Sequence, residues 1–209
     1  ALQNLCTSYL PPVRAYIRSK GYREEDARDL SQEFFTTLLE KDWLRAADQT
    51  RGKFRTFLLT SLNHFLSNQR MRQRAQKRGG GIPDLPIDDA ERVAQPSSTL
   101  ESEFDRKWAL TVLECALDRL WREHESNGAL ERFDVLKSCL TPSEPGATYR
   151  EIAERLDISE GAAKVACHRL KKAYGAAIRA EIAETISENG DADEELKYLM
   201  NALSATGKP

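Results

Sequence analysis

The sequence predicts an all-α protein built from two helical domains. Apolar residues recur at spacings of three and four along most of the chain, and almost no stretch alternates with a period of two. Glycine and proline are scarce and clustered, which leaves room for long helices between the clusters. With 40% hydrophobic residues among 209, the chain is large enough to bury a core without disulfides or metals.

The first domain is expected over residues 1–78 and contains three helical segments. The first runs from about residue 2 to 20, is bent or restarted at Pro11 and Pro12, and ends at Gly21. The second runs from about residue 24 to 41 and begins with three acidic residues, which suit the positive end of the helix dipole. The third spans about residues 54–76 and is followed by three glycines and two prolines, which stop it.

Residues 79–100 are predicted to be an acidic linker containing Gly and Pro, because large apolar residues are few there. The second domain is expected over residues 101–186. It begins with a helix at about 101–125 and a shorter helix after Asn127-Gly128, and it ends in a helix-turn-helix formed by about 148–156 and 159–186. Residues 187–209 form an acidic C-terminal tail with a short amphipathic helix, which we expect to dock on the second domain.

The net charge of -2 hides blocks of alternating sign. Lys and Arg outnumber Asp and Glu by 15 to 8 in residues 1–80 and by 7 to 4 in residues 148–179. Acidic residues outnumber basic ones by 14 to 7 in residues 81–147 and by 7 to 2 in residues 180–209. Two separated basic blocks favour two surfaces for a polyanion, although solvated helix faces would produce the same alternation.

Other classes of protein have little support. Four widely spaced cysteines without a C-x-x-C motif predict neither a disulfide framework nor a zinc site, and we interpret them as reduced in a cytoplasm (Cys6, Cys115, Cys139, Cys167). No apolar stretch reaches the roughly 18 to 20 residues that cross a bilayer, so no membrane partner is expected. No phosphate loop, nucleophile–base pair or metal cluster is visible, so we expect no enzymatic activity, no metal and no cofactor.

The segment at residues 149–172 is the strongest local signal for binding duplex DNA. Ser159 suits the N-cap of its second helix, and Ala163, Cys167 and Leu170 share one inward face of that helix. The small Gly161 would let the helix start approach a major groove. The outward residues expected to contact DNA are Ser159, Gly161, Lys164, His168, Arg169 and Lys172. A helical hairpin with a solvated basic face is the alternative.

The third helix of the first domain carries a second candidate surface for DNA. Its apolar stripe includes Phe57, Leu58 and Phe65, and the opposite face combines hydroxyls, amides and cations. Such a mixture suits a single strand or an opened duplex, because it can bond exposed base edges and hold the backbone. The residues expected to contact DNA are Lys53, Asn63, Ser67, Arg70, Arg72 and Arg74. A solvated face is again the alternative.

The second helix is predicted to present an acidic surface to a protein partner. Ala27, Leu30 and Phe34 fall on its inward face. Acidic, amide and hydroxyl side chains fall on the outward face, at Asp29, Gln32, Glu33 and Thr36. An acidic stripe is unsuited to nucleic acid, so we expect it to bind a basic protein surface.

These patterns resemble bacterial RNA polymerase sigma factors. The segment Asp26-Ala-Arg-Asp-Leu-Ser-Gln-Glu-Phe-Phe-Thr-Thr-Leu-Leu is similar to the family signature D-A-x-D-L-x-Q-E-x-F-x-x-L-L. Phe54-Arg-Thr-Phe-Leu-Leu with Asn63 is similar to the promoter-melting helix, and residues 149–172 are similar to the second DNA-binding domain. Two such domains with little between them resemble the extracytoplasmic-function group.

The resemblance implies transcription initiation in the cytoplasm. The acidic residues of the second helix would bind core RNA polymerase, the third helix would bind and melt the -10 element of promoter DNA, and the helix-turn-helix would bind the -35 element. The resemblance also makes an anti-sigma protein a candidate partner. Asp157 stands where the family often has Gly, in a position that Asp tolerates in a left-handed conformation. Ala163 and Cys167 are smaller than the usual Val and Leu.

Two other functions remain as alternatives. A stand-alone helix-turn-helix regulator comes first, and a helical adaptor or small enzyme comes second. A regulator of that kind needs dimer symmetry and a closed-duplex operator, and the sequence shows no heptad seam long enough to dimerise. It would also have no use for the acidic stripe of the second helix.

Overall fold

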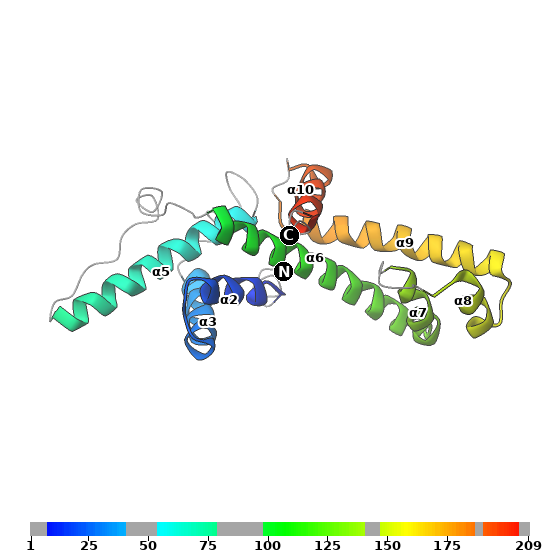
Figure 1. Cartoon of the computed structure of the whole chain (residues 1–209), viewed down its shortest axis with the longest axis horizontal. Helices are drawn as coiled ribbons and strands as arrows, with labels where there is room; N and C mark the ends of the chain where they lie inside the picture. Colours follow the sequence, from blue (N-terminus) through cyan, green and yellow to red (C-terminus); the bar gives the residue numbers. More distant parts are fainter. Residues whose placement is uncertain (1–7, 41–53, 79–97, 141–146, 187–189, 205–209) are drawn as a thin grey trace. The chain divides into compact units, whose positions relative to one another are not determined.

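The computed structural model describes residues 8–40, 54–78, 98–140, 147–186 and 190–204 (Figure 1). Within these ranges the regular elements are helices and no strand occurs, so the predicted all-α fold class is confirmed. The chain divides into two compact units, Ala1–Thr111 with Thr185–Pro209 and Val112–Glu184. Each unit has its own apolar core.

The first unit begins with two helices that the local sequence explains. Helix α2 spans Leu10–Ser19 and has its two prolines in the first turn, where backbone N–H groups need no partner within the helix. The prolines therefore lie at the start of α2. Gly21, with a φ of +91°, ends this segment as predicted. Helix α3 spans Glu24–Glu40 and begins with the expected acidic turn of Glu24, Glu25 and Asp26.

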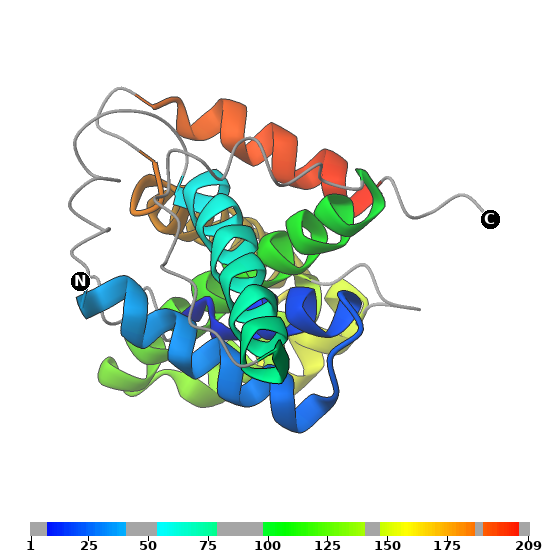
Figure 2. The same cartoon turned by 90° about the vertical axis from the view of Figure 1, so that its left-hand side faces the viewer.

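Helix α5, Phe54–Arg78, and the first half of α6, Ser98–Ser126, complete the core of the first unit. The rings of Phe34 in α3 and Phe65 in α5 lie 5.6 Å apart, so these two helices pack on each other (Figures 1 and 2). Trp108 of α6 stacks on Tyr9 with ring centroids 3.8 Å apart. Phe104 of α6 is fully buried against Tyr16 of α2.

The C-terminal helix α10, Ala192–Ser204, belongs to the first unit. Figure 2 shows it in orange to red beside the beginning of α6, in green. Glu195 and Leu199 are buried there, and Glu195 contacts Arg55 of α5. This helix was expected to dock on the second domain at residues 101–186, and it instead contacts both Arg55 of α5 and Asp105 of α6 within the first unit. The sequence correctly predicted an amphipathic helix here. An amphipathic pattern predicts that one face of a helix is buried, but it does not predict which helix covers that face.

The second unit is formed by the second half of α6, α7 at Leu130–Leu136, a short 3-10 helix η2 at Lys137–Cys139, α8 at Tyr149–Leu156 and α9 at Glu160–Ala183. Its core includes Leu120 from α6, Phe133 from α7, Ile152 from α8, and Ala163 and Leu170 from α9. Helices α7, α8 and α9 contact one another. The small inward residues of α9 allow this close packing.

The division into units differs from the predicted boundary at residues 79–100. The first half of α6 was assigned to the second domain, but Phe104 and Trp108 bury their rings in the first unit. The composition of residues 79–100 suggested the boundary; residues 79–97 lie outside the described residues, and residues 98–100 belong to α6 rather than to a linker. The sequence carries no signal where α6 passes from one core to the other, because apolar residues recur at helical spacing through both halves of the helix.

Candidate nucleic-acid and protein interfaces

Local hydrogen bonds determine where α8 and α9 begin and end. Thr148 and Glu151 form a reciprocal capping box at the start of α8, and these hydrogen bonds hold the pKa of the Glu151 carboxyl below its usual value. Asp157 ends α8 with a φ of +52°, the left-handed conformation that the sequence allowed for it. The Ser159 hydroxyl accepts a hydrogen bond of 3.2 Å from the Ala162 amide and caps α9, as predicted.

Contacts along the second half of α9 orient the helix on α6. The Tyr174 hydroxyl donates a hydrogen bond of 3.0 Å to the carbonyl of Leu113. Arg119 of α6 donates to Glu181 and Glu184 at 2.7 Å each. These contacts hold one side of α9 against α6, so the same opposite side faces outward throughout the unit.

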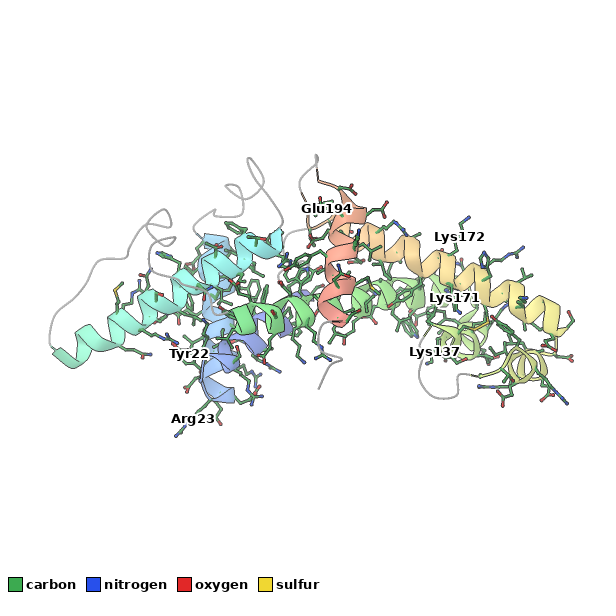
Figure 3. All side chains as sticks on the ribbon, turned by 45° about the horizontal axis from the view of Figure 1, so that its top comes forward. Tyr22, Arg23, Lys137, Lys171, Lys172 and Glu194 are labelled. Carbon is green, nitrogen blue, oxygen red and sulfur yellow. A yellow bond between two sulfur atoms is a disulfide. The ribbon has the colours of Figure 1, made fainter. Side chains whose placement is uncertain are left out.

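The outward side of α9 is cationic. The predicted residues Gly161, Lys164, His168, Arg169 and Lys172 are all exposed, while Ala163, Cys167 and Leu170 are buried as expected. Among the described residues, no carboxylate forms an ion pair with any of these cations. Figure 3 labels Lys171 and Lys172 on this helix. The structure therefore leaves a positively charged helix face available to a polyanion.

Two features of this face suit close approach to a nucleic acid. A methyl group added at Gly161 would meet nothing within 4 Å, so the start of α9 is open. Val165 is 50% exposed in the middle of the cationic side chains. An apolar side chain at such a position can contact the methyl group of thymine in a major groove. Val165 was not among the residues predicted to contact DNA.

The structure joins Cys139 of η2 to Cys167 of α9 by a disulfide, with Cα atoms 6.0 Å apart. The expectation that these cysteines are reduced and unpaired is therefore wrong. The two residues are 28 positions apart in the sequence, and spacing alone does not reveal which cysteines approach each other in a fold. Cys167 keeps its predicted place on the inward side of α9, so the disulfide leaves the cationic side uncovered.

The acidic surface of α3 is exposed as predicted. The four residues expected to bind a protein partner are all exposed, at Asp29, Gln32, Glu33 and Thr36. The opposite side of α3 buries Ala27, Phe34 and Leu38. Glu33 accepts a hydrogen bond from Gln69 of α5, so this surface borders the second candidate DNA surface within the first unit.

The candidate DNA surface on α5 is only partly described. Arg70 and Arg72 are exposed, and Asn63 and Ser67 are half-buried. Lys53 and the side chain of Arg74, which were also predicted to contact DNA, lie outside the described residues. The side chains of Asn63 and Arg70 already make contacts within the first unit, unlike the cations of α9.

Two tyrosines position these α5 residues, and the sequence did not identify either one. The Tyr16 hydroxyl donates a hydrogen bond of 2.8 Å to the Asn63 side-chain oxygen. Arg70 donates a hydrogen bond of 3.2 Å to the Tyr22 hydroxyl, and its guanidinium lies 5.6 Å from the centre of the Tyr22 ring. Figure 3 labels Tyr22 near the start of α3. Contacts across 47 and 48 residues of sequence leave no periodic signal.

A buried ionic cluster joins α5, α6 and α10 in the first unit. Arg55 donates hydrogen bonds to Asp105 and to Glu195, the latter at 3.3 Å, and all three side chains are nearly inaccessible to solvent. The Tyr198 hydroxyl also donates to Asp105. Burial alone would lower the pKa of Arg55, but attraction by the two carboxylates more than offsets it and raises this pKa. Arg55 is therefore a buried cation, a role the sequence did not suggest.

No metal centre or membrane span emerges from the described residues. Their His, Cys, Asp and Glu side chains form no group of three or more that could hold a metal ion. None of the helices described is both long and apolar enough to span a bilayer. In comparisons with protein-family models, curated proteins and solved structures, no match to this chain was found.

Proposed function

We propose that this chain is a sigma factor of the extracytoplasmic-function type, which binds core RNA polymerase and directs it to promoter DNA. The observation that carries the proposal is the coexistence of an exposed acidic surface on α3 and an exposed cationic side on α9. A protein that only binds DNA needs the second surface and gains nothing from the first. The likeness of residues 26–39 to the sigma-factor signature supplies the identity of the protein partner.

In this proposal the acidic surface of α3 binds the polymerase. The carboxylates of Asp29 and Glu33 would pair with basic side chains of the polymerase clamp, with Gln32 and Thr36 beside them. Their exposure means that little desolvation opposes the encounter, and their common sign favours rapid association with a basic surface. The chain itself performs no chemical step, so binding energy is its only contribution to promoter opening.

The two cationic regions would bind two elements of one promoter. Helices α8 and α9 form the helix-turn-helix, and the cationic side of α9 would enter the major groove of the -35 element. Asn63, Ser67, Arg70 and Arg72 on α5, with Lys53 and Arg74, would bind the -10 element and favour its melted form. An anti-sigma protein that masks these surfaces and a cytoplasmic location complete the proposal.

Reconstituted transcription tests this function directly. The purified chain is added to bacterial core RNA polymerase with a library of DNA fragments, and run-off transcripts are sequenced. A sigma factor should yield transcripts that start downstream of a common pair of sequence elements. A stand-alone regulator, which the same α8 and α9 would suit, should instead bind duplex DNA without polymerase and yield no specific transcripts.

Charge reversal on α3 tests the polymerase surface. Asp29→Lys combined with Glu33→Lys should weaken binding to core polymerase by at least about 30-fold, because charged hot spots contribute about 2 kcal/mol or more. The matched control is Glu123→Lys with Glu125→Lys, which makes the same charge change at exposed positions of α6. Equal co-elution of both double variants with polymerase would refute the assignment of α3.

A further inference from the structure

The disulfide of the second unit closes a loop around α8 and the beginning of α9. It joins Cys139, the last residue of η2, to Cys167 of α9, which lies 28 positions later in the sequence. All of α8 and about the first two turns of α9 lie between these two cysteines. The left-handed Asp157 and the cap at Ser159 lie there as well. The disulfide therefore constrains the segment that begins the cationic side of α9.

Few apolar contacts hold the beginning of α9 in place. In residues 160–169 the buried side chains are those of Ala163, Ala166 and Cys167, and the first large buried side chain is that of Leu170. Alanine side chains bury little apolar area, so they contribute little to the stability of this part of the helix. Segments with few buried apolar contacts open locally at a low cost in free energy. The disulfide thus connects η2 covalently to α9 at a point where side-chain packing is sparse.

The two cysteines of this disulfide differ in their exposure to solvent. Cys139 is half-buried, whereas Cys167 is 1% exposed. Thiol–disulfide exchange begins with the attack of a thiolate on one sulfur of the disulfide, and its rate depends on access to that sulfur. A thiolate from solution therefore reaches Cys139 more readily than Cys167.

We propose that the disulfide between Cys139 and Cys167 is a reversible redox switch, which holds α8 and the beginning of α9 in the form that binds duplex DNA and weakens this binding when it is reduced. The inference rests on the proposed function, from which both the duplex DNA and the cytoplasmic location come. Thiol systems keep most cytoplasmic cysteines reduced, and the disulfides that form there are usually transient and catalytic or redox-sensing.

Reduction by a dithiol follows a balanced sequence of two exchanges. One thiolate of the dithiol attacks Sγ of Cys139, and Sγ of Cys167 leaves as a thiolate that takes up a proton. The second thiolate of the dithiol then displaces Sγ of Cys139, which also takes up a proton. Two electrons and two protons pass to the protein, and the dithiol becomes a disulfide. Oxidation of the two cysteines by a disulfide reagent reverses these steps.

Reduction should make α8 and the beginning of α9 open more often. A disulfide stabilises a fold mainly by restricting the unfolded chain, and for a loop of this length its loss should raise the opening equilibrium by about 30-fold or more. Only the assembled helices hold the cations of α9 in one arrangement. The apparent affinity for DNA falls in proportion to the fraction of molecules that are assembled.

The test compares the full chain in its oxidised and reduced forms. Alkylation followed by mass spectrometry identifies the cysteines that are disulfide-bonded in each form. Amide hydrogen exchange in residues 149–167 should be about 30-fold or more faster after reduction with dithiothreitol, and exchange in α5, which belongs to the first unit, should not change. Fluorescence anisotropy with a labelled random-sequence DNA duplex should show an affinity about fivefold or more lower for the reduced chain.

Cysteine variants assign the response to this disulfide. Cys139→Ala should bind the duplex as weakly as the reduced wild type, and its affinity should be the same with and without dithiothreitol. The matched control is Cys115→Ala, because Cys115 lies in the same unit and outside the disulfide. This control should respond to dithiothreitol as the wild type does.

Three results would overturn the inference. These are equal duplex affinities of the oxidised and reduced wild type, a response to dithiothreitol that persists in Cys139→Ala, and free thiols at both Cys139 and Cys167 in the chain treated with a disulfide reagent. Absence of specific transcripts in the run-off assay would instead overturn the sigma-factor function. A redox-dependent affinity for duplex DNA would in that case still support the switch.

Discussion

The two candidate DNA surfaces differ in how their side chains are held. On α9, Lys164, Arg169 and Lys172 are exposed and form no ion pair with a described carboxylate. On α5, the side chain of Asn63 accepts a hydrogen bond from Tyr16, and the side chain of Arg70 donates one to Tyr22. Exposed cations without an ion pair lose side-chain conformational entropy when they bind, but they can adjust to many phosphate positions. Side chains that are already hydrogen-bonded lose less conformational entropy on binding, and they fit fewer ligand geometries. The difference predicts electrostatic affinity from α9 and geometric selectivity from α5.

A third arrangement occurs on the inward side of α5. Arg55 is one of the cations in the basic first block of the sequence, yet it is 8% exposed and paired with two carboxylates. Charge counted along a sequence therefore overstates the charge available to a polyanion. The contrast between Arg55 and the α9 lysines distinguishes a structural cation from candidate binding cations, and the following variants test that distinction.

The largest effect is expected for Arg55→Met. Removing the cation leaves Asp105 and Glu195 buried without their partner, which should lower the free energy of unfolding of the first unit by about 3 to 5 kcal/mol. Urea unfolding followed by amide exchange in α5 and α10 measures the loss. Arg150→Met is the control, because its ion pair with Glu154 is exposed and should contribute less than about 1 kcal/mol. Similar stabilities of the two variants would contradict the structural role of Arg55.

The next effect concerns the affinity of α9 for duplex DNA. Lys164→Ala with Lys172→Ala should remove two phosphate contacts, lower the slope of log affinity against log salt by about 1.8, and weaken binding about 30-fold at 0.15 M salt. Fluorescence anisotropy over a salt series measures both quantities. The control is Lys137→Ala, since Lys137 lies in the same unit and is paired with Asp134 at 2.8 Å. An unchanged slope in the double variant would show that these lysines do not contact phosphates.

A smaller effect is expected at the surface of α5. Tyr22→Leu removes both the ring and the hydroxyl that hold Arg70, and it should weaken binding to a single-stranded -10 oligonucleotide by about twofold to fivefold, as for a cation–π contact of about 0.5 to 1 kcal/mol. Tyr22→Phe keeps the ring and should have a smaller effect. Affinity for duplex -35 DNA serves as the internal control. If it falls equally in Tyr22→Leu, the proposed division between α5 and α9 is wrong.

The smallest effect is a pH dependence at the start of α8. The pKa of Glu151 is lower in the folded protein than its usual value of 4.5, because Thr148 donates hydrogen bonds to the carboxylate. Its contribution to stability is therefore complete above pH 4.5 and is lost as the pH falls through the folded pKa. Glu151→Gln should show a shallower decline in the stability of the second unit between pH 5 and 3. Parallel curves for wild type and variant would exclude this origin.

The sequence by itself determined the helices and their faces. Apolar spacing placed the inward residues of α3 and α9, and the caps at Thr148 and Ser159 follow from residues only three positions away. Asp157 adopts the left-handed conformation expected of it for the same local reason. Exposure of the acidic and cationic candidate residues could likewise be predicted, because a helix with one apolar side must turn its other side to solvent.

Only the tertiary structure decided which helices meet. The pairing of Arg55 with Glu195 spans 140 residues, the approach of Cys139 to Cys167 spans 28, and the docking of α10 on the first unit depends on both α5 and α6. For each of these contacts, the residues that flank it in the sequence do not indicate which distant residue is the partner. Helix formation depends on interactions within about one turn, whereas docking depends on how whole surfaces fit and on which buried charges find a counter-charge.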